Sequence, residues 1–268
     1  MRILVCFMFI MISAASAQAA TVTFADYTFE TYIVSDSPPS GRLYEFWEGR
    51  HWVLRVREEQ EYSIIVRNPM PVRVAVALTV DGLNTIDGRH TKPDRGRKWI
   101  IEPFQSITIG GWQTGADGSR KFIFTRPERS YAQWKENRDQ SNHTKNLGVI
   151  GVAYFWNSRE LYQALHPPQP FAEREAKQSQ TPGRKKQERR PAAQKRQSSD
   201  DRAGTGMGRE VYHPVKKVHF DFDTGMYTNR DVLKIFYRFD RNAITPQPFI
   251  DERKLRKQEE FAPEMPRY

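Results

Sequence analysis

Residues 72–80 read Val-Arg-Val-Ala-Val-Ala-Leu-Thr-Val, and they decide the fold class. In an extended chain successive side chains point to opposite faces, so the even positions of this stretch make one wholly apolar face. Ala75 and Ala77 make much of the opposite face apolar as well. A strand that is apolar on both faces belongs inside a sheet whose two faces are covered. The stretch therefore predicts a buried central strand.

Segments of similar composition flank residues 72–80 in both directions. Alternating or aromatic-rich apolar residues, bounded by Gly, Pro, Asn and Asp, are typical of strands. On this criterion we expect strands over 27–34, 51–57, 61–67, 99–101, 104–109, 121–125 and 147–156, and again over 215–222 and 232–239. Short helices are expected within 130–146, 158–165 and 251–261. About ten short strands separated by turns favour an all-β fold, an antiparallel β-sandwich.

A long basic segment interrupts this pattern at residues 166–203. It carries ten Lys or Arg and five Asp or Glu, a local excess of +5 within a chain of net charge +10, and Phe171 is its one aromatic residue. Such a segment buries too little apolar surface to offset the entropy of ordering, so we expect a disordered insert. Two strands alone do not make a stable domain, so the strands after the insert are expected to complete the sheets before it.

The domain organisation follows from these boundaries. We expect a signal peptide over 1–19, the first part of the sandwich over 20–165, the basic insert over 166–203, two closing strands within 204–245, and a polar tail over 246–268. The sandwich is thus one domain interrupted by the insert.

The first residues are typical of a secretory signal. Arg2 supplies a positive start, residues 3–12 are an unbroken apolar run, and the small residues 15–19 offer cleavage sites. Cleavage predicts an exported protein, periplasmic or secreted. Cys6, the one cysteine, lies within this signal, which excludes disulfides and thiolate metal sites from the processed chain. No later apolar stretch has membrane length, so no transmembrane segment is expected in that chain.

Several short elements resemble a group of bacterial exported proteins of unknown function. They are Val80-Asp81-Gly82-Leu83-Asn84 with Asp87-Gly88, Gly110-Gly111-Trp112, Leu147-Gly148-Val149-Ile150-Gly151-Val152-Ala153 and Gly204-Thr205-Gly206-Met207-Gly208. The match covers roughly 45–157 and 204–240. The resemblance implies an exported location and a glycine-rich element that leads into two closing strands. It implies no activity and transfers no catalytic residue.

The glycine-rich element at 204–208 does not predict a phosphate site. A phosphate loop needs a preceding strand and a following helix, whereas here a basic segment precedes and a strand is expected to follow. We interpret these glycines, like Gly110 and Gly111, as positions of special backbone geometry or close backbone approach. No cofactor is expected.

The histidines and carboxylates give no clear catalytic or metal pattern. The six histidines lack metal-ligand spacing, and we expect solvated surface histidines. Asp81 and Asp87 precede glycines, as turn-forming residues do, although paired carboxylates could also serve acid–base catalysis or bind calcium. This alternative is the only support for an enzyme, for which an envelope-polymer hydrolase is the hypothesis.

The basic insert is the strongest partner signal. Its candidate residues for binding an anionic surface are Arg184, Lys185, Lys186, Arg189, Arg190, Lys195 and Arg196. Lipid headgroups, lipopolysaccharide or a polyanionic glycan would attract such a run, while a solvated tether without a partner stays open. Intracellular nucleic acid is not expected for an exported chain. The sequence therefore favours a non-catalytic envelope or secreted binding or structural protein, with an envelope-polymer hydrolase or a subunit of an envelope assembly as alternatives.

Overall fold

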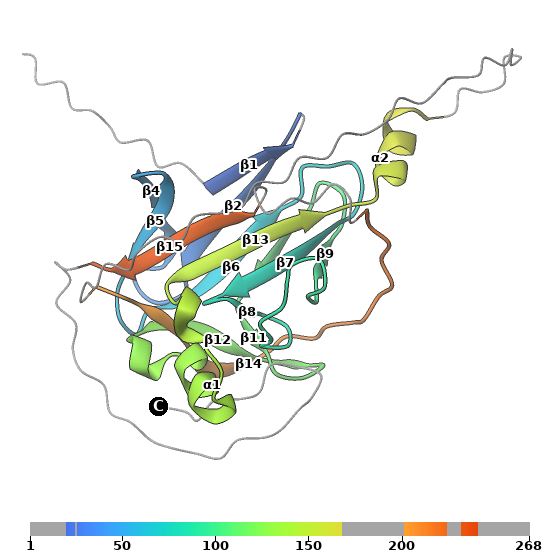
Figure 1. The fold of residues 1–268 in the computed structure, drawn as a ribbon. Helices are drawn as coiled ribbons and strands as arrows, with labels where there is room; N and C mark the ends of the chain where they lie inside the picture. Colours follow the sequence, from blue (N-terminus) through green and yellow to red (C-terminus); the bar gives the residue numbers. More distant parts are fainter. Residues whose placement is uncertain (1–19, 25, 168–200, 224–231, 241–268) are drawn as a thin grey trace, which may run out of the picture.

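The protein folds into two β-sheets packed face to face, with two short α-helices at the periphery (Figure 1). The structure is a computed structural model, and it describes residues 20–24, 26–167, 201–223 and 232–240. The all-β fold class is confirmed. Most of the predicted basic insert, the predicted signal peptide and the predicted helix at 251–261 lie outside the described residues.

The first sheet has eight strands. They are β1 (Ala20–Phe24), β2 (Tyr27–Ser35), β3 (Gly41–Leu43), β6 (Glu61–Arg67), β10 (Ser106–Ile109), β11 (Gly111–Gln113), β12 (Gly118–Thr125) and β14 (Gly204–Tyr212). The order β1-β2-β6-β12-β11 forms its main path, while β3, β10 and β14 pair with β2, β6 and β12. Every pairing in this sheet is antiparallel.

The second sheet has seven strands. They are β4 (Glu45–Glu48), β5 (His51–Val56), β7 (Val74–Val80), β8 (Leu83–Asn84), β9 (Trp99–Ile101), β13 (Val149–Phe155) and β15 (Leu233–Phe239). Its order is β4-β5-β15-β13-β7-β8, with β9 paired to β7. The pair β15–β5 is parallel, so this sheet is mixed and not purely antiparallel as predicted.

The helices are α1 (Tyr131–Asp139) and α2 (Ser158–Leu165), and 3₁₀ turns lie at Pro127–Arg129 and Thr144–Asn146. Ser130 caps α1 through its side chain, which accepts from the amide of Gln133. Asn157 caps α2 in the same way. Both caps satisfy amides that have no partner within the helix. No helix among the described residues is long and apolar enough to cross a membrane.

The central strand β7 is covered on both faces, as its composition predicts. Val74, Val76 and Leu78 point into the main core between the sheets. On the opposite face, Ala75 and Ala77 form a small second cluster with Ala153 and Phe155, and Ile100, Phe220, Phe222 and Val232 pack against it. The chain beyond β14 therefore supplies part of the cover on the outer face of the second sheet.

The two strands after residue 200 each join a different sheet. β14 pairs with β12 from Thr125↔Gly204 to Gly118↔Tyr212. β15 lies between β13 and β5. Segments that precede and follow residues 168–200 in the chain are thus hydrogen-bonded within both layers (Figure 1).

The predicted strand at 215–222 is wrong, because residues 213–223 belong to no strand. The glycine-rich residues 204–208 form the first of the two closing strands instead. Pro214 removes a backbone donor immediately after β14. The alternating Phe220 and Phe222 then pack on the second sheet from outside, without joining its ladder. Period two therefore reports an extended chain with one buried face, which does not require a neighbouring strand.

Candidate functional site

Asp81 is a fully buried acid held by three hydrogen bonds. Its carboxylate accepts hydrogen bonds from the amide of Gly148 at 2.8 Å, the amide of Thr205 at 2.7 Å and the Tyr237 hydroxyl at 2.5 Å. The side chain is fully buried, and its backbone has φ of 52°. Aspartate tolerates this left-handed conformation better than most residues do. Asp81 thus joins the turn after β7 to the loop before β13 and to both closing strands.

The hydrogen bonds beyond Asp81 run in one direction. Tyr237 donates its single proton to Asp81, so its oxygen accepts from Thr205 Oγ1 at 2.7 Å. Thr205 then accepts from the Tyr62 hydroxyl, also at 2.7 Å. Tyr62 thus donates to Thr205, Thr205 to Tyr237 and Tyr237 to Asp81, and we call these four residues the Asp81 network. Its members are all buried, so every bond in it is shielded from water.

Burial raises the pKa of Asp81 to about 7, and the hydrogen bonds from Tyr237, Thr205 and Gly148 oppose this shift. Burial also raises the pKa of Tyr62 and of Tyr237 well above the ordinary range. A carboxyl group with such a pKa could in principle serve acid–base chemistry. Asp81 has no exposed surface, however, and its partners are the atoms that hold the two closing strands. Its geometry is that of a structural residue, which holds β14 and β15 to the turn after β7.

The carboxylates predicted as an alternative catalytic pair do not share a site. Asp87 accepts from the amide of Arg89 at 3.0 Å and lies 3.6 Å from the Arg97 guanidinium. Neither Asp81 nor Asp87 lines any of the three hollows described below. The Asp87 carboxylate bonds within its own turn, as the turn-forming interpretation predicts, whereas the Asp81 carboxylate bonds to residues that are distant in the chain.

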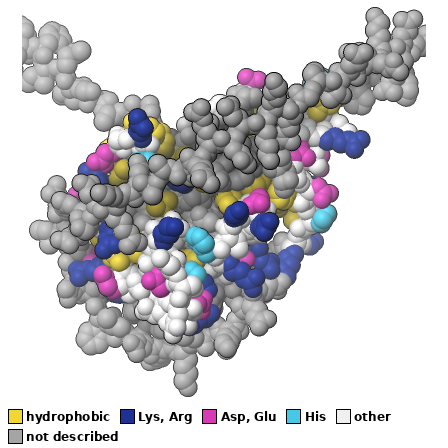
Figure 2. All heavy atoms as spheres, viewed as in Figure 1, with side chains coloured by type: hydrophobic (Ala, Val, Ile, Leu, Met, Phe, Trp, Pro, Cys, Tyr) yellow, Lys and Arg dark blue, Asp and Glu magenta, His cyan; other side chains and the backbone are white. Residues whose placement is uncertain are grey.

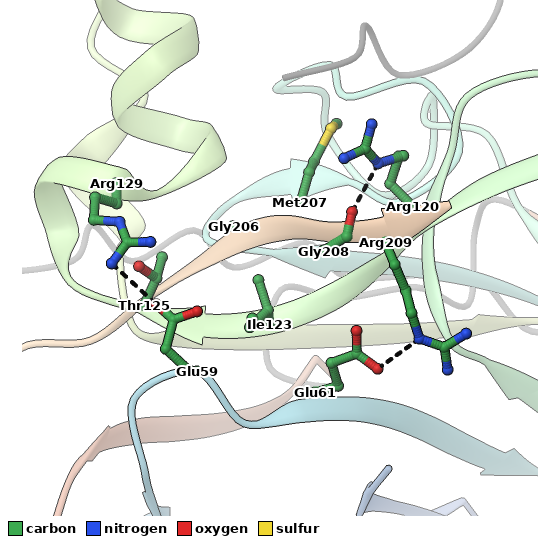
Figure 3. A pocket seen from close by; sticks show the side chains of 10 residues that line it. All are labelled: Glu59, Glu61, Arg120, Ile123, Thr125, Arg129, Gly206, Met207, Gly208 and Arg209. Carbon is green, nitrogen blue, oxygen red and sulfur yellow. Dashed lines mark hydrogen bonds and ion pairs between the residues drawn. The ribbon is translucent and has the colours of Figure 1, made fainter. Parts of the chain in front are cut away.

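The glycine-rich strand β14 forms the floor of a small pocket of about 250 Å³ (Figure 3). A Cβ at Gly206 would lie 3.2 Å from Thr125 and 3.3 Å from Ile123, and a Cβ at Gly208 would lie 3.3 Å from Glu61. The glycines therefore allow close packing, as predicted for special backbone positions. At Gly111 the approach is closer still, since a Cβ would lie 2.0 Å from the Arg120 carbonyl oxygen.

Two ion pairs neutralise four of the five charged side chains that line this small pocket, and the fifth, Arg120, is buried and donates to the Gly208 carbonyl. Figure 3 shows Glu59 facing Arg129 on one side and Glu61 facing Arg209 on the other. The ion-pair distances are 3.0 Å and 3.1 Å. An incoming charged ligand would have to break one of these pairs. The small pocket is thus a poor candidate for binding an ion or a charged group.

A second hollow of about 380 Å³ lies beside β15, and ion pairs also occupy its charged side chains. The Arg238 guanidinium donates to both carboxylate oxygens of Glu48, at 2.9 Å and 2.6 Å, and lies 3.8 Å from Asp201. The charges that line this hollow are therefore also largely satisfied within the protein.

The largest of these three hollows, which we call the basic groove, has a volume of about 1010 Å³ and lies on the outer face of the second sheet. It runs between the edge at β7 and β9 and the segment 215–222. Its lining residues are Arg73, Ala75, Ile86, Gly96, Arg97, Lys98, Trp99, Ile100, Glu102, Ala116, Val215, Lys216, Lys217, Val218, His219, Phe220 and Phe222. Figure 2 shows dark blue Lys and Arg side chains gathered on the right of this face. Figure 1 draws the segment 213–223 there, as the orange trace that runs up toward α2.

Positive charge dominates the basic groove, with five Lys or Arg against the single acid Glu102. Among the residues that the structure describes, no carboxylate pairs with Arg73 or Lys216. Arg97 lies 3.6 Å from Asp87, and Lys98 interacts electrostatically with Asp94. A groove with one sign of charge attracts ligands of the opposite sign.

Aromatic rings are interleaved with these cations. The Arg73 guanidinium lies 5.5 Å from the ring centre of Phe220, and Lys98 Nζ lies 4.5 Å from that of Phe222. Lys98 also donates to the carbonyls of Asp94 and Gly96, and burial lowers its pKa. Trp99 is fixed by its indole N–H, which donates to Thr85. The groove therefore presents preorganised rings beside cationic side chains.

Four of the six histidines are exposed, as predicted, and two are not. His143 is buried next to Ser141 and Asp139, and His213 is half-buried against Gln113 and Trp99. Burial lowers the pKa of both. The prediction of solvated histidines is wrong for these two, because turn and strand-end contacts that the sequence does not reveal enclose them. Within the described ranges, no three His, Cys, Asp or Glu residues gather as a metal site would require.

The seven basic residues predicted to bind an anionic surface, Arg184 to Arg196, lie outside the described residues. Sequence reasoning missed the basic groove, because Arg73, Lys98 and Lys216 lie far apart in the chain. One signal was present: Lys216 and Lys217 stand immediately before the alternating aromatic residues Phe220 and Phe222.

No family model, curated protein or solved structure matches this chain. The resemblance to exported proteins of unknown function therefore stays a prediction, and the function rests on the geometry of the grooves and surfaces.

Proposed function

We propose that this protein is an exported, non-catalytic binding module whose basic groove takes a polyanionic glycan. The observation that carries the proposal is the groove itself, with five Lys or Arg around three aromatic rings and one acid. Its volume lies at the upper end of the range of ligand sites. The proposal keeps the polyanionic partner that the sequence favours and moves the principal site from the insert to the folded domain.

Two physical terms support a carbohydrate ligand. Cations in a groove raise the local concentration of an anionic polymer and strengthen its binding, especially at low salt. Trp99, Phe220 and Phe222 add flat apolar surface, against which the apolar faces of sugar rings can pack. A single-stranded nucleic acid would use similar contacts, and the predicted export of the chain favours the glycan.

The basic insert would add a second, less specific attraction. Its cations, Arg184 to Arg196, follow α2 in the chain and precede β14, so they are tethered to the domain that carries the groove. Such a tether raises the effective concentration of a long polymer near the groove. The groove would then set the preference among polymers, and the insert would add salt-sensitive affinity.

A binding titration with matched variants tests the proposal. Polygalacturonate serves as the anionic glycan, dextran as the neutral polymer and a single-stranded oligonucleotide as the competing class. The variant Arg73→Gln/Lys216→Gln removes two groove cations, and the control Lys145→Gln/Arg202→Gln removes two exposed cations outside the groove. We expect the groove variant to bind polygalacturonate about 30-fold more weakly, because each of the two cations supplies on the order of 1 kcal/mol near the surface.

The control variant is expected to change affinity by less than about threefold, since it removes the same charge without altering the groove. Equal losses in both variants would contradict the proposal and assign binding to net charge alone. A preference for the oligonucleotide over the glycan would overturn the choice of ligand. Binding to dextran as strong as to polygalacturonate would overturn the role of charge.

A further inference from the structure

The hairpin of β4 and β5 forms one edge of the second sheet. Gly49 and Arg50 make its two-residue turn, both with positive φ, of 59° and 111°. Positive φ at both turn positions matches the twist of a tight hairpin. Figure 1 shows β4 at the outer limit of the molecule, away from α1 and the closing strand β14. The hairpin therefore presents its tip and outer strand to the surroundings.

This hairpin carries a cluster of exposed aromatic side chains. Tyr44 is 53 % exposed, Phe46 50 % and Trp47 64 %. Single exposed apolar residues are ordinary on protein surfaces, whereas three within four positions are not. Trp47 contacts Trp52 across the hairpin in an edge-to-face arrangement, with ring centres 5.1 Å apart. The cluster is thus organised and does not result from a disordered loop.

The aromatic side chains lie on both faces of the hairpin. Phe46 and Trp47 are neighbours in β4, so they point to opposite sides of the strand. The register agrees, since Phe46 lies opposite Val53 and Trp47 opposite Trp52. A flat protein partner would cover only one of these faces. If the hairpin instead entered a layer edge-on, that layer would cover both faces of the hairpin.

The charges of the hairpin favour an anionic layer. Arg50 at the tip and Arg55 on β5 are exposed. Of the acids, Glu45 is buried, and Glu48 is held by the Arg238 guanidinium at 2.6 Å. The outward-facing charge is therefore positive. Trp and Tyr rings settle at the headgroup level of bilayers, and Arg adjacent to them binds anionic headgroups.

We propose that the β4–β5 hairpin docks the protein on an anionic lipid surface, with Phe46 and Trp47 at headgroup depth and Arg50 at the lipid phosphates. This proposal is independent of the basic groove, because the hairpin and the groove share no residue. The two together describe a protein that rests on a membrane surface while its groove holds a polymer.

Vesicle binding by the full chain tests the hairpin. Vesicles of equal parts phosphatidylglycerol and phosphatidylcholine are compared with pure phosphatidylcholine in 0.3 M salt, which screens long-range attraction by the basic insert. We expect Phe46→Ser/Trp47→Ser to weaken partition onto the anionic vesicles at least tenfold. The control Tyr212→Ser removes an aromatic ring that is 80 % exposed on the other sheet, and it should bind as the parent does.

Depth is read from quenching by lipids with brominated acyl chains. The parent should be quenched on anionic vesicles, and Trp47→Phe should lose most of that quenching while it still binds. Far-ultraviolet circular dichroism should be unchanged in the variants, since the altered residues are exposed.

Two outcomes would overturn the proposal. Equal partition of Phe46→Ser/Trp47→Ser and the parent would show that the hairpin does not contact lipid. Absence of vesicle binding by the parent, together with a dimer that this variant converts to a monomer, would assign the aromatic cluster to self-association. Light scattering after size exclusion distinguishes the latter.

Discussion

Thr205→Val is expected to destabilise the protein by about 2–4 kcal/mol, although valine has nearly the shape of threonine. Thr205 Oγ1 accepts from Tyr62 and donates to Tyr237, both at 2.7 Å, in a fully buried position. The substitution removes both bonds. It leaves the Tyr62 hydroxyl without its acceptor and the Tyr237 oxygen without its donor.

The magnitude follows from these two losses. Loss of the bond from Thr205 to Tyr237 costs about 1 kcal/mol, and loss of the bond from Tyr62, which leaves a buried donor without an acceptor, costs about 1–3 kcal/mol. The sum is about 2–4 kcal/mol, a large part of the stability of an ordinary domain. Tyr62→Phe in the Thr205→Val background should then cost little more, because the bond that it would remove is already lost.

Thr125→Val is the matched control. Thr125 lies on the adjacent strand β12 and is 3 % exposed, but its hydroxyl has no hydrogen-bond partner within the described part of the chain. Its replacement should be neutral or stabilise by about 1 kcal/mol, because burial of an unpaired hydroxyl is unfavourable. Urea unfolding at pH 8, followed by tryptophan fluorescence, measures both variants. Equal free energies of unfolding for Thr205→Val and Thr125→Val would refute the Asp81 network as a stabilising element.

Two further predictions concern a buried acid and a constrained glycine. Burial raises the pKa of Glu45 to about 7, against the weaker opposing effect of Arg42, so the folded carboxyl holds a proton that the unfolded chain has already lost. Stability from this group therefore falls as pH rises from about 4.5 to 7, and Glu45→Gln should be more stable than the parent by about 1–3 kcal/mol at pH 8 but not at pH 4.5, as thermal unfolding at both pH values would reveal. Gly148→Ala combines φ of 76° with a Cβ only 2.9 Å from the Tyr237 carbonyl oxygen, whereas Gly49→Ala has φ of 59° in open space. Both substitutions incur about 1 kcal/mol of backbone strain, and urea unfolding should show at least about 1 kcal/mol more for Gly148→Ala; equal losses would contradict the close approach.

The sequence pattern predicts which segments are covered in the layers of this fold better than it predicts which segments pair as strands. Period two identifies β7 as a doubly covered strand, because its two apolar faces are local facts. The same period at 215–222 misleads, since an extended segment packed on a sheet has the same alternation as a strand within it. Short edge strands such as β4 escape notice because four residues carry little periodic signal.

The sites were harder to predict for a topological reason. Asp81 reads as a turn former, and only the fold places it against Thr205, 124 positions later in the chain, and against Tyr237. The basic groove likewise brings together Arg73 and Lys216, which lie far apart in the chain. Long-range juxtapositions of this kind leave no local trace, whereas the predicted anionic-surface residues 184–196 were visible because they form one continuous run.

Hydrogen exchange followed by mass spectrometry tests the proposed binding site most directly. The amides of His213, Val215 and Asp223 donate to backbone carbonyls, whereas residues 216–222 lie outside both sheets, so their amides are expected to exchange quickly in the free protein. Saturating polygalacturonate should slow exchange within 213–223 and around 96–102, the two walls of the basic groove. Unchanged exchange in both walls, with protection elsewhere or nowhere, would contradict the groove as the binding site.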